Sequence, residues 1–64
     1  MINSISGKIF KKEPTVLYIE NNGIVFSISI CLRDYEKLPS EHENVFIYTY
    51  LNVKENLMEL YGFM

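Results

Sequence analysis

Short runs of mainly apolar residues, rich in β-branched and aromatic types, occupy most of the chain between polar, glycine- or proline-containing breaks, and this pattern predicts β-strands. Side chains of a strand point to opposite faces in turn, and β-branched and aromatic residues favour this conformation. The predicted strands cover residues 2–12, 15–20, 24–30, 44–53 and 57–63. Asn21-Asn22-Gly23 separates the second strand from the third and predicts a tight hairpin turn, because Asn and Gly tolerate positive φ.

Two interruptions shape the predicted fold. Gly7 lies inside the first strand, where a glycine often marks a bulge or a sharp bend. From Leu32 to Leu38 the strand pattern stops, and Leu32, Tyr35 and Leu38 have the spacing of one short helical turn before Pro39. Five short strands, with a helical turn between the third and the fourth, predict a small all-β Greek-key barrel of the OB type. Without an internal repeat or linker, residues 1–64 are expected to form one domain.

The strand predicted over 44–53 is apolar on both of its faces. One face carries, in order, Val45, Ile47, Thr49, Leu51 and Val53. The opposite face carries Phe46, Tyr48 and Tyr50. A strand of this kind buries one face in its own core and the other against a loop, a helix or another subunit.

Size and composition favour association with another subunit. A chain of 64 residues removes only about 60% of its unfolded surface from water, which leaves a single small core marginally stable. Cys31 is the only cysteine and His42 the only histidine, so neither a disulfide within the chain nor a structural zinc site is expected. The net charge of −2 is that of an ordinary soluble domain, and the single unpaired thiol suits a reducing cytosol. No apolar run is long enough to span a membrane.

The residues Lys54-Glu55-Asn56 separate the last two predicted strands, so they form the tip of a predicted hairpin. This tip places one carboxylate, that of Glu55, away from the domain, and the residues alone leave open that Glu55 is simply a solvated turn residue. No nucleophile, base and orienting group form a recognisable set, and there is no glycine-rich phosphate loop. We therefore expect no catalysis, no metal and no cofactor.

A second function class also deserves a test. Lys8, Lys11 and Lys12 suggest a basic patch for phosphates, although in an acidic chain they are more typical of a solvated strand end. OB barrels also bind single-stranded nucleic acid by stacking bases on aromatic side chains. The candidates for such a platform are Tyr18, Phe26, Tyr48 and Tyr50. The alternative function is therefore a free-standing module that binds single-stranded nucleic acid.

Several of these segments, taken together, resemble the N-terminal domain of the RuvA family, without gaps over essentially the whole chain. The matching residues are Met1-Ile2 with Gly7, Leu17 to Ile19 before a glycine-containing turn, Tyr35-Glu36-Lys37-Leu38-Pro39, and Val53-Lys54-Glu55-Asn56 followed by Leu60-Tyr61-Gly62-Phe63. The closing hairpin is the most specific part of the resemblance.

The resemblance implies an OB-fold domain of a bacterial, cytoplasmic subunit that recognises Holliday-junction DNA in recombination, DNA repair and the SOS response. Proteins of this family form homotetramers, and their second domain holds the DNA backbone with helix-hairpin-helix motifs. A third domain binds the RuvB ATPase, and the RuvC resolvase joins through the complete complex. By this resemblance, the later domains are expected to be absent from residues 1–64 and the chain itself is not an enzyme.

In this family the tip of the last hairpin carries an acidic pin, usually two adjacent carboxylates after an arginine or lysine. On this chain the pin corresponds to Glu55 and Asn56, with Lys54 before them. Asn56 keeps the shape of an aspartate but not its charge, so each subunit presents one pin carboxylate instead of two. Phe46, Tyr48 and Tyr50 are the expected contact with a neighbouring subunit.

Overall fold

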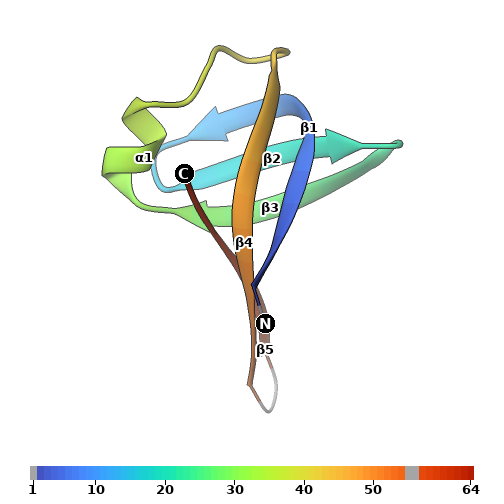
Figure 1. The fold of residues 1–64 in the computed structure, drawn as a ribbon, viewed down its shortest axis with the longest axis vertical. Helices are drawn as coiled ribbons and strands as arrows, with labels where there is room; N and C mark the ends of the chain where they lie inside the picture. Colours follow the sequence, from blue (N-terminus) through green and yellow to red (C-terminus); the bar gives the residue numbers. More distant parts are fainter. Residues whose placement is uncertain (1, 55–56) are drawn as a thin grey trace.

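The computed structural model describes residues 2–54 and 57–64, which form a closed barrel with strand order β1-β2-β3-β5-β4 (Figure 1). The elements in chain order are β1 (Ile2–Glu13), β2 (Val16–Asn21), β3 (Ile24–Ile30), α1 (Leu32–Glu36), β4 (Asn44–Lys54) and β5 (Leu57–Phe63). The predicted OB-type architecture, with a short helix between the third and fourth strands, is confirmed.

The turns on either side of β2 both contain residues with positive φ. Asn22 and Gly23 have φ values of 51° and 83°, which confirms the predicted tight turn between β2 and β3. Before β2, Thr15 has a φ of 68° and belongs to the turn. The second strand consequently begins at Val16, one residue later than predicted, and β1 continues to Glu13.

β1 is long because it pairs with two different strands. Its first half pairs with β4, and at Lys8 it passes to β2, since Lys8 faces both Asn44 and Glu20. The predicted irregularity exists, but the bulge falls at Phe10, between the pairs formed by Ile9 and Lys11, and not at Gly7. Gly7 instead permits a close approach, because a Cβ there would overlap the backbone carbonyl oxygen of Glu20.

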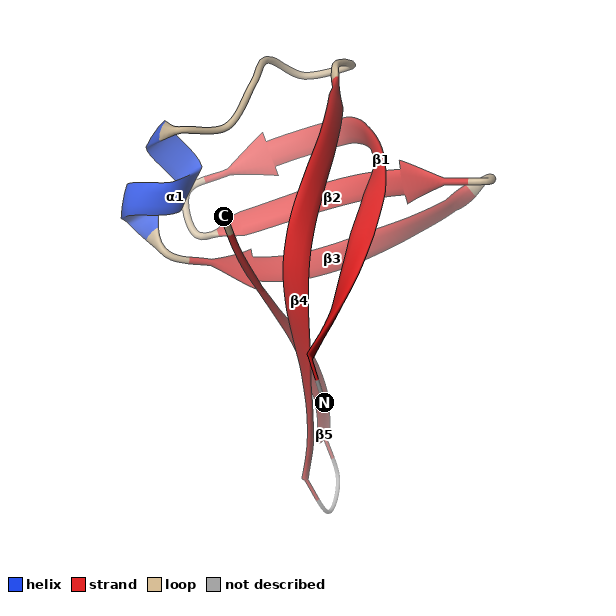
Figure 2. Ribbon diagram, in the orientation of Figure 1, coloured by secondary structure: helices blue, strands red, loops and turns tan. Residues whose placement is uncertain are grey.

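The core consists of the inward-facing members of the alternating pattern, all of them aliphatic. The buried hydrophobic residues are Ile9, Leu17, Ile19, Ile28, Ile30, Leu38 and Ile47. Figure 2 shows α1 beside the barrel, and Leu38, just after the helix, is the residue of this segment that enters the core. Leu32, at the start of the predicted helical turn, is exposed.

The barrel closes where β3 runs parallel to β5. The pairs are Ser29 with Tyr61 and Ile30 with Gly62. A Cβ on Gly62 would lie 2.6 Å from Cγ2 of Ile28 and 2.9 Å from Cγ2 of Ile47, closer than carbon atoms normally pack. Closure of the barrel therefore depends on a residue without a side chain at this point.

Candidate functional site: the hairpin arm and its aromatic face

The hairpin of β4 and β5 extends beyond the barrel. β1 pairs with β4 only as far as Ile2 with Tyr50. Beyond Tyr50 the β4–β5 ladder continues through four further pairs, from Leu51–Leu60 to Lys54–Leu57. Figure 1 shows this part of the hairpin standing clear of the other strands. We call residues 51–54 and 57–60 the arm. On the arm, Val53 and Met58 face each other across the ladder and are 63% and 69% exposed, because no core lies beneath them.

The predicted pin residues, Glu55 and Asn56, lie outside the described residues. Lys54 is the last residue of β4, and its backbone pairs with Leu57, the first residue of β5. The described ladder thus confirms the predicted hairpin and its length up to these two positions. The role assigned to Glu55, Asn56 and Lys54 stays a prediction.

The outward side of the hairpin, at the arm, carries a polar cluster that was not predicted from the sequence. The Tyr61 hydroxyl donates a hydrogen bond to Oε2 of Glu59. This bond to a carboxylate raises the pKa of Tyr61 above its ordinary value, and a hydrogen bond with Asn52 partly opposes that effect. Asn52 lies directly across the ladder from Glu59. The sequence contained one signal for this cluster, because Glu59 is a charged residue in a strand that is otherwise mostly apolar.

An aromatic face begins where the arm meets the barrel. Phe46, Tyr48 and Tyr50 lie on one side of β4, as predicted, and are 52%, 48% and 42% exposed. The register adds two aromatic residues from β5, since Tyr48 pairs with Phe63 and Tyr50 with Tyr61. The rings of Phe46 and Tyr48 meet edge to face at 5.1 Å, and those of Tyr48 and Phe63 stack at 5.9 Å.

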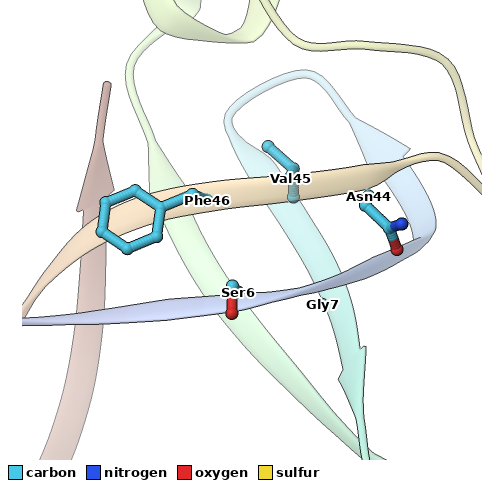
Figure 3. A pocket seen from close by; sticks show the side chains of 5 residues that line it. All are labelled: Ser6, Gly7, Asn44, Val45 and Phe46. Carbon is cyan, nitrogen blue, oxygen red and sulfur yellow. The ribbon is translucent and has the colours of Figure 1, made fainter.

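Small side chains border this aromatic face on the β1 side. Ser6 lies across from Phe46 and Ser4 from Tyr48. A shallow hollow beside the Phe46 ring is lined by Ser6, Gly7, Asn44, Val45 and Phe46. Figure 3 shows Phe46, Ser6 and Asn44 around it, with Val45 pointing the other way. The aromatic side chains therefore stand above their neighbours on β1, and the face is accessible to a large partner.

The structure does not assemble the two alternative nucleic-acid surfaces. Lys11 forms an ion pair with Glu13 at 3.0 Å, and Lys12 Nζ donates to the carbonyl oxygen of Pro39 at 3.0 Å. Two of the three lysines of the suggested basic patch are thus engaged within the protein. Phe26 packs against the core, whereas Tyr48 lies on the outward face of β4, so these aromatics do not share one platform.

Other candidate chemistry is sparse in the described part of the chain. No three His, Cys, Asp or Glu residues among the described positions come together in a way that would hold a metal ion. Cys31 is exposed and unpaired, and His42 is exposed, with its backbone amide bonded to the carbonyl oxygen of Ile9 at 2.7 Å. Within residues 2–54 and 57–64, no helix is long and apolar enough to cross a membrane.

Fold and site together define a class of protein: a small OB barrel with a projecting β-hairpin arm and an accessible aromatic face. Comparison with known families narrows this class. A family model described as the RuvA N terminal domain matches residues 1–62, and the chain belongs to that family.

Curated relatives cover the same residues. The chain is 43% identical over 63 residues to the Holliday junction branch migration complex subunit RuvA of Christiangramia forsetii, covering 98% of this chain and 32% of that protein. It is 41% identical over 64 residues to the protein of the same description from Lachnospira eligens, covering 100% of this chain and 31% of the relative. For Chloroherpeton thalassium the identity is 36% over 64 residues, with 100% and 32% coverage. The chain thus spans about a third of the length of these relatives.

Proposed function

We propose that this chain is the self-associating, junction-crossover domain of a Holliday-junction-binding protein that supports branch migration. The observation that carries the proposal is the match of the RuvA N terminal domain over residues 1–62, which includes the whole arm. In this proposal the chain catalyses no reaction. It works in a homotetramer on four-way DNA in the bacterial cytoplasm, with the RuvB ATPase as motor and the RuvC resolvase as a further partner.

The proposed work of the hairpin is to select branched DNA by repulsion. DNA carries a dense line of phosphate charge, so a carboxylate at the centre of the docking face makes continuous duplex unfavourable there. A four-way junction leaves an opening at its crossover and suffers less repulsion. Rejection of the wrong ligand by like charge then contributes to specificity. Glu55 is the carboxylate to which we assign this role, with Asn56 beside it and Lys54 before it.

Self-association is supported by the aromatic face. Phe46, Tyr48 and Tyr50 form one continuous outward surface with Phe63 and Tyr61, and all five side chains are between 38% and 52% exposed. Aromatic residues are enriched where proteins contact each other, and a contiguous exposed patch of them indicates a binding surface. We assign this face to the contact with a neighbouring copy of the chain.

The test is the substitution Glu55→Gln in the intact protein, with everything that its gene encodes. One carboxylate and one phosphate about 10 Å apart in water repel by roughly 0.4 kcal/mol, before screening by salt. With four copies at one crossover, we expect the preference for junction over linear duplex to fall by about three- to tenfold at low salt. Competition binding between a four-way junction and a linear duplex of the same sequence measures this ratio.

Glu36→Gln is the matched control, because Glu36 is an exposed carboxylate at the end of α1, and this helix lies beside the barrel, away from the arm (Figure 1). It makes the same change in net charge and should leave the ratio unaltered. An unmodified protein that binds linear duplex as well as it binds a junction would refute the proposed function. An unchanged ratio in Glu55→Gln would refute the role of the pin.

A further inference from the structure

Glu59 is the only carboxylate among the described residues of the arm, 51–54 and 57–60. It lies on β5 directly across from Asn52, two pairs away from the last described pair, Lys54 with Leu57. Each strand residue advances by about 3.4 Å, so the backbone of Glu59 is about 7 Å from that of Leu57. This separation is shorter than the Debye length of about 10 Å at 0.1 M salt. A polyanion that reaches the end of the described ladder therefore meets the charge of Glu59.

A hydrogen bond orients this carboxylate. The Tyr61 hydroxyl donates to Oε2 of Glu59, and Asn52 lies directly across the ladder from Glu59. All three side chains share the outward face of the β4–β5 ladder, because Asn52 pairs with Glu59 and Tyr61 follows two residues later on the same strand. A glutamate alone on a strand surface samples several rotamers, whereas this one has a hydrogen-bond donor, the Tyr61 hydroxyl, on the same face. The charge is thereby presented on a defined side of the arm.

Glu59 also decides the sign of the charge on this part of the hairpin. Residues 51–60 contain one lysine, Lys54, and two acids, Glu55 and Glu59. With Glu59 the segment carries a formal charge of −1, and without it the charges of Lys54 and Glu55 cancel. The neutral Asn56 leaves no other acid in the segment to restore the negative sign.

We propose that Glu59, held by Tyr61 on the outward face of the arm, is a second specificity-determining carboxylate that disfavours continuous duplex DNA. The inference rests on the proposed function, and it assigns to β5 part of the repulsion otherwise attributed to the hairpin tip alone. The recognised feature of the ligand is the unbroken phosphate backbone of linear duplex, which a four-way junction does not present at its centre.

The experiment uses two variants of the intact protein, Glu59→Gln and Glu59→Asp. Binding of a fluorescent four-way junction is measured in competition with a linear duplex of the same sequence, at 50 and 300 mM KCl. For Glu59→Gln we expect the junction preference to fall by about two- to threefold at the lower salt concentration, with a smaller change at the higher one. Glu59→Asp keeps the charge and should keep the preference of the unmodified protein. Thermal unfolding of each variant verifies that the fold is retained.

The outcomes separate this inference from the proposed function. If Glu55→Gln lowers the junction preference and Glu59→Gln does not, the proposed function stands and the role of Glu59 is refuted. If Glu59→Gln and Glu59→Asp lower the preference equally, or if the effect does not depend on salt, Glu59 acts through shape or packing and the charge account is overturned. If the unmodified protein shows no junction preference, the proposed function itself fails.

Discussion

Replacing Gly62 by Ala tests whether the barrel closes as described. Gly62 lies on β5 between Ile30 of β3 and Thr49 of β4. A methyl group there would sit 2.6 Å from Cγ2 of Ile28 and 2.9 Å from Cγ2 of Ile47, whose side chains are both fully buried. Carbon atoms pack favourably at about 3.5–4.0 Å, so the first contact is roughly 1 Å too short.

The magnitude follows from two opposing effects. Forcing an extra methylene-sized group into a packed core costs about 1–3 kcal/mol. Against this, Ala restricts the unfolded chain more than Gly does and contributes about 0.4–1 kcal/mol of stability. We expect the free energy of unfolding to fall by about 1–2 kcal/mol, from a total of about 3–10 kcal/mol for a domain of this size. For so small a domain, this loss lowers Tm by about 5–15 °C.

The measurement is thermal and urea unfolding followed by circular dichroism, with a double-mutant cycle. Ile28→Leu removes the Cγ2 methyl that causes the closest contact while keeping nearly the same volume. Combined with Gly62→Ala, it should make the loss smaller than the sum of the two single losses by more than 0.5 kcal/mol, which is the usual limit of additivity. A Gly62→Ala variant as stable as the unmodified protein, or strictly additive losses, would show that this packing is wrong.

Two further predictions concern the arm and the aromatic face. The hydrogen bond from Tyr61 to Glu59 raises the pKa of Tyr61 in the folded protein. The contribution of this bond to stability is therefore present below the ordinary tyrosine pKa of about 10. It is lost as the pH rises through the higher pKa of the folded state. In Glu59→Gln the pKa of Tyr61 should return towards 10, as followed by NMR of tyrosine ring carbons, and an unchanged titration would contradict the bond. Tyr48→Ser should weaken self-association at least about tenfold in sedimentation equilibrium, whereas Phe10→Ser, an equally exposed aromatic at the bulge, should not. Equal effects of the two substitutions would contradict assignment of the interface to the aromatic face.

The strands were predictable because local signals agreed with one another. Apolar runs rich in β-branched and aromatic residues, bounded by turn residues, identified all five, and the Asn22-Gly23 turn fixed the hairpin between β2 and β3. Because side chains of a strand alternate between its two faces, the sequence also placed Ile47 on one face of β4 and Phe46 and Tyr48 on the other. These features depend on neighbours in the sequence, which is why one chain sufficed to predict them.

Features that depend on distant contacts were harder to predict. A glycine in a strand indicates either a bulge or a close approach, and only the pairing of β1 with β2 shows that Gly7 serves the second purpose while Phe10 forms the bulge. The hydrogen bond between Tyr61 and Glu59 likewise depends on the direction of the two side chains. The position of Asn52 beside them depends on the register of β4 and β5.

Within the described parts of β3 and β5, barrel closure rests on two residue pairs, Ser29 with Tyr61 and Ile30 with Gly62, each joining positions 32 residues apart in the sequence. A ribosome adds about 5–20 residues per second from the N-terminus, so it delivers the residues that seal the barrel after every other strand. Non-local pairings of this kind also form slowly, because the intervening loop must be ordered first. Until Gly62 has emerged, the nascent chain exposes the open edge of β3, and a stalled translation product is accordingly a substrate for chaperones or for aggregation.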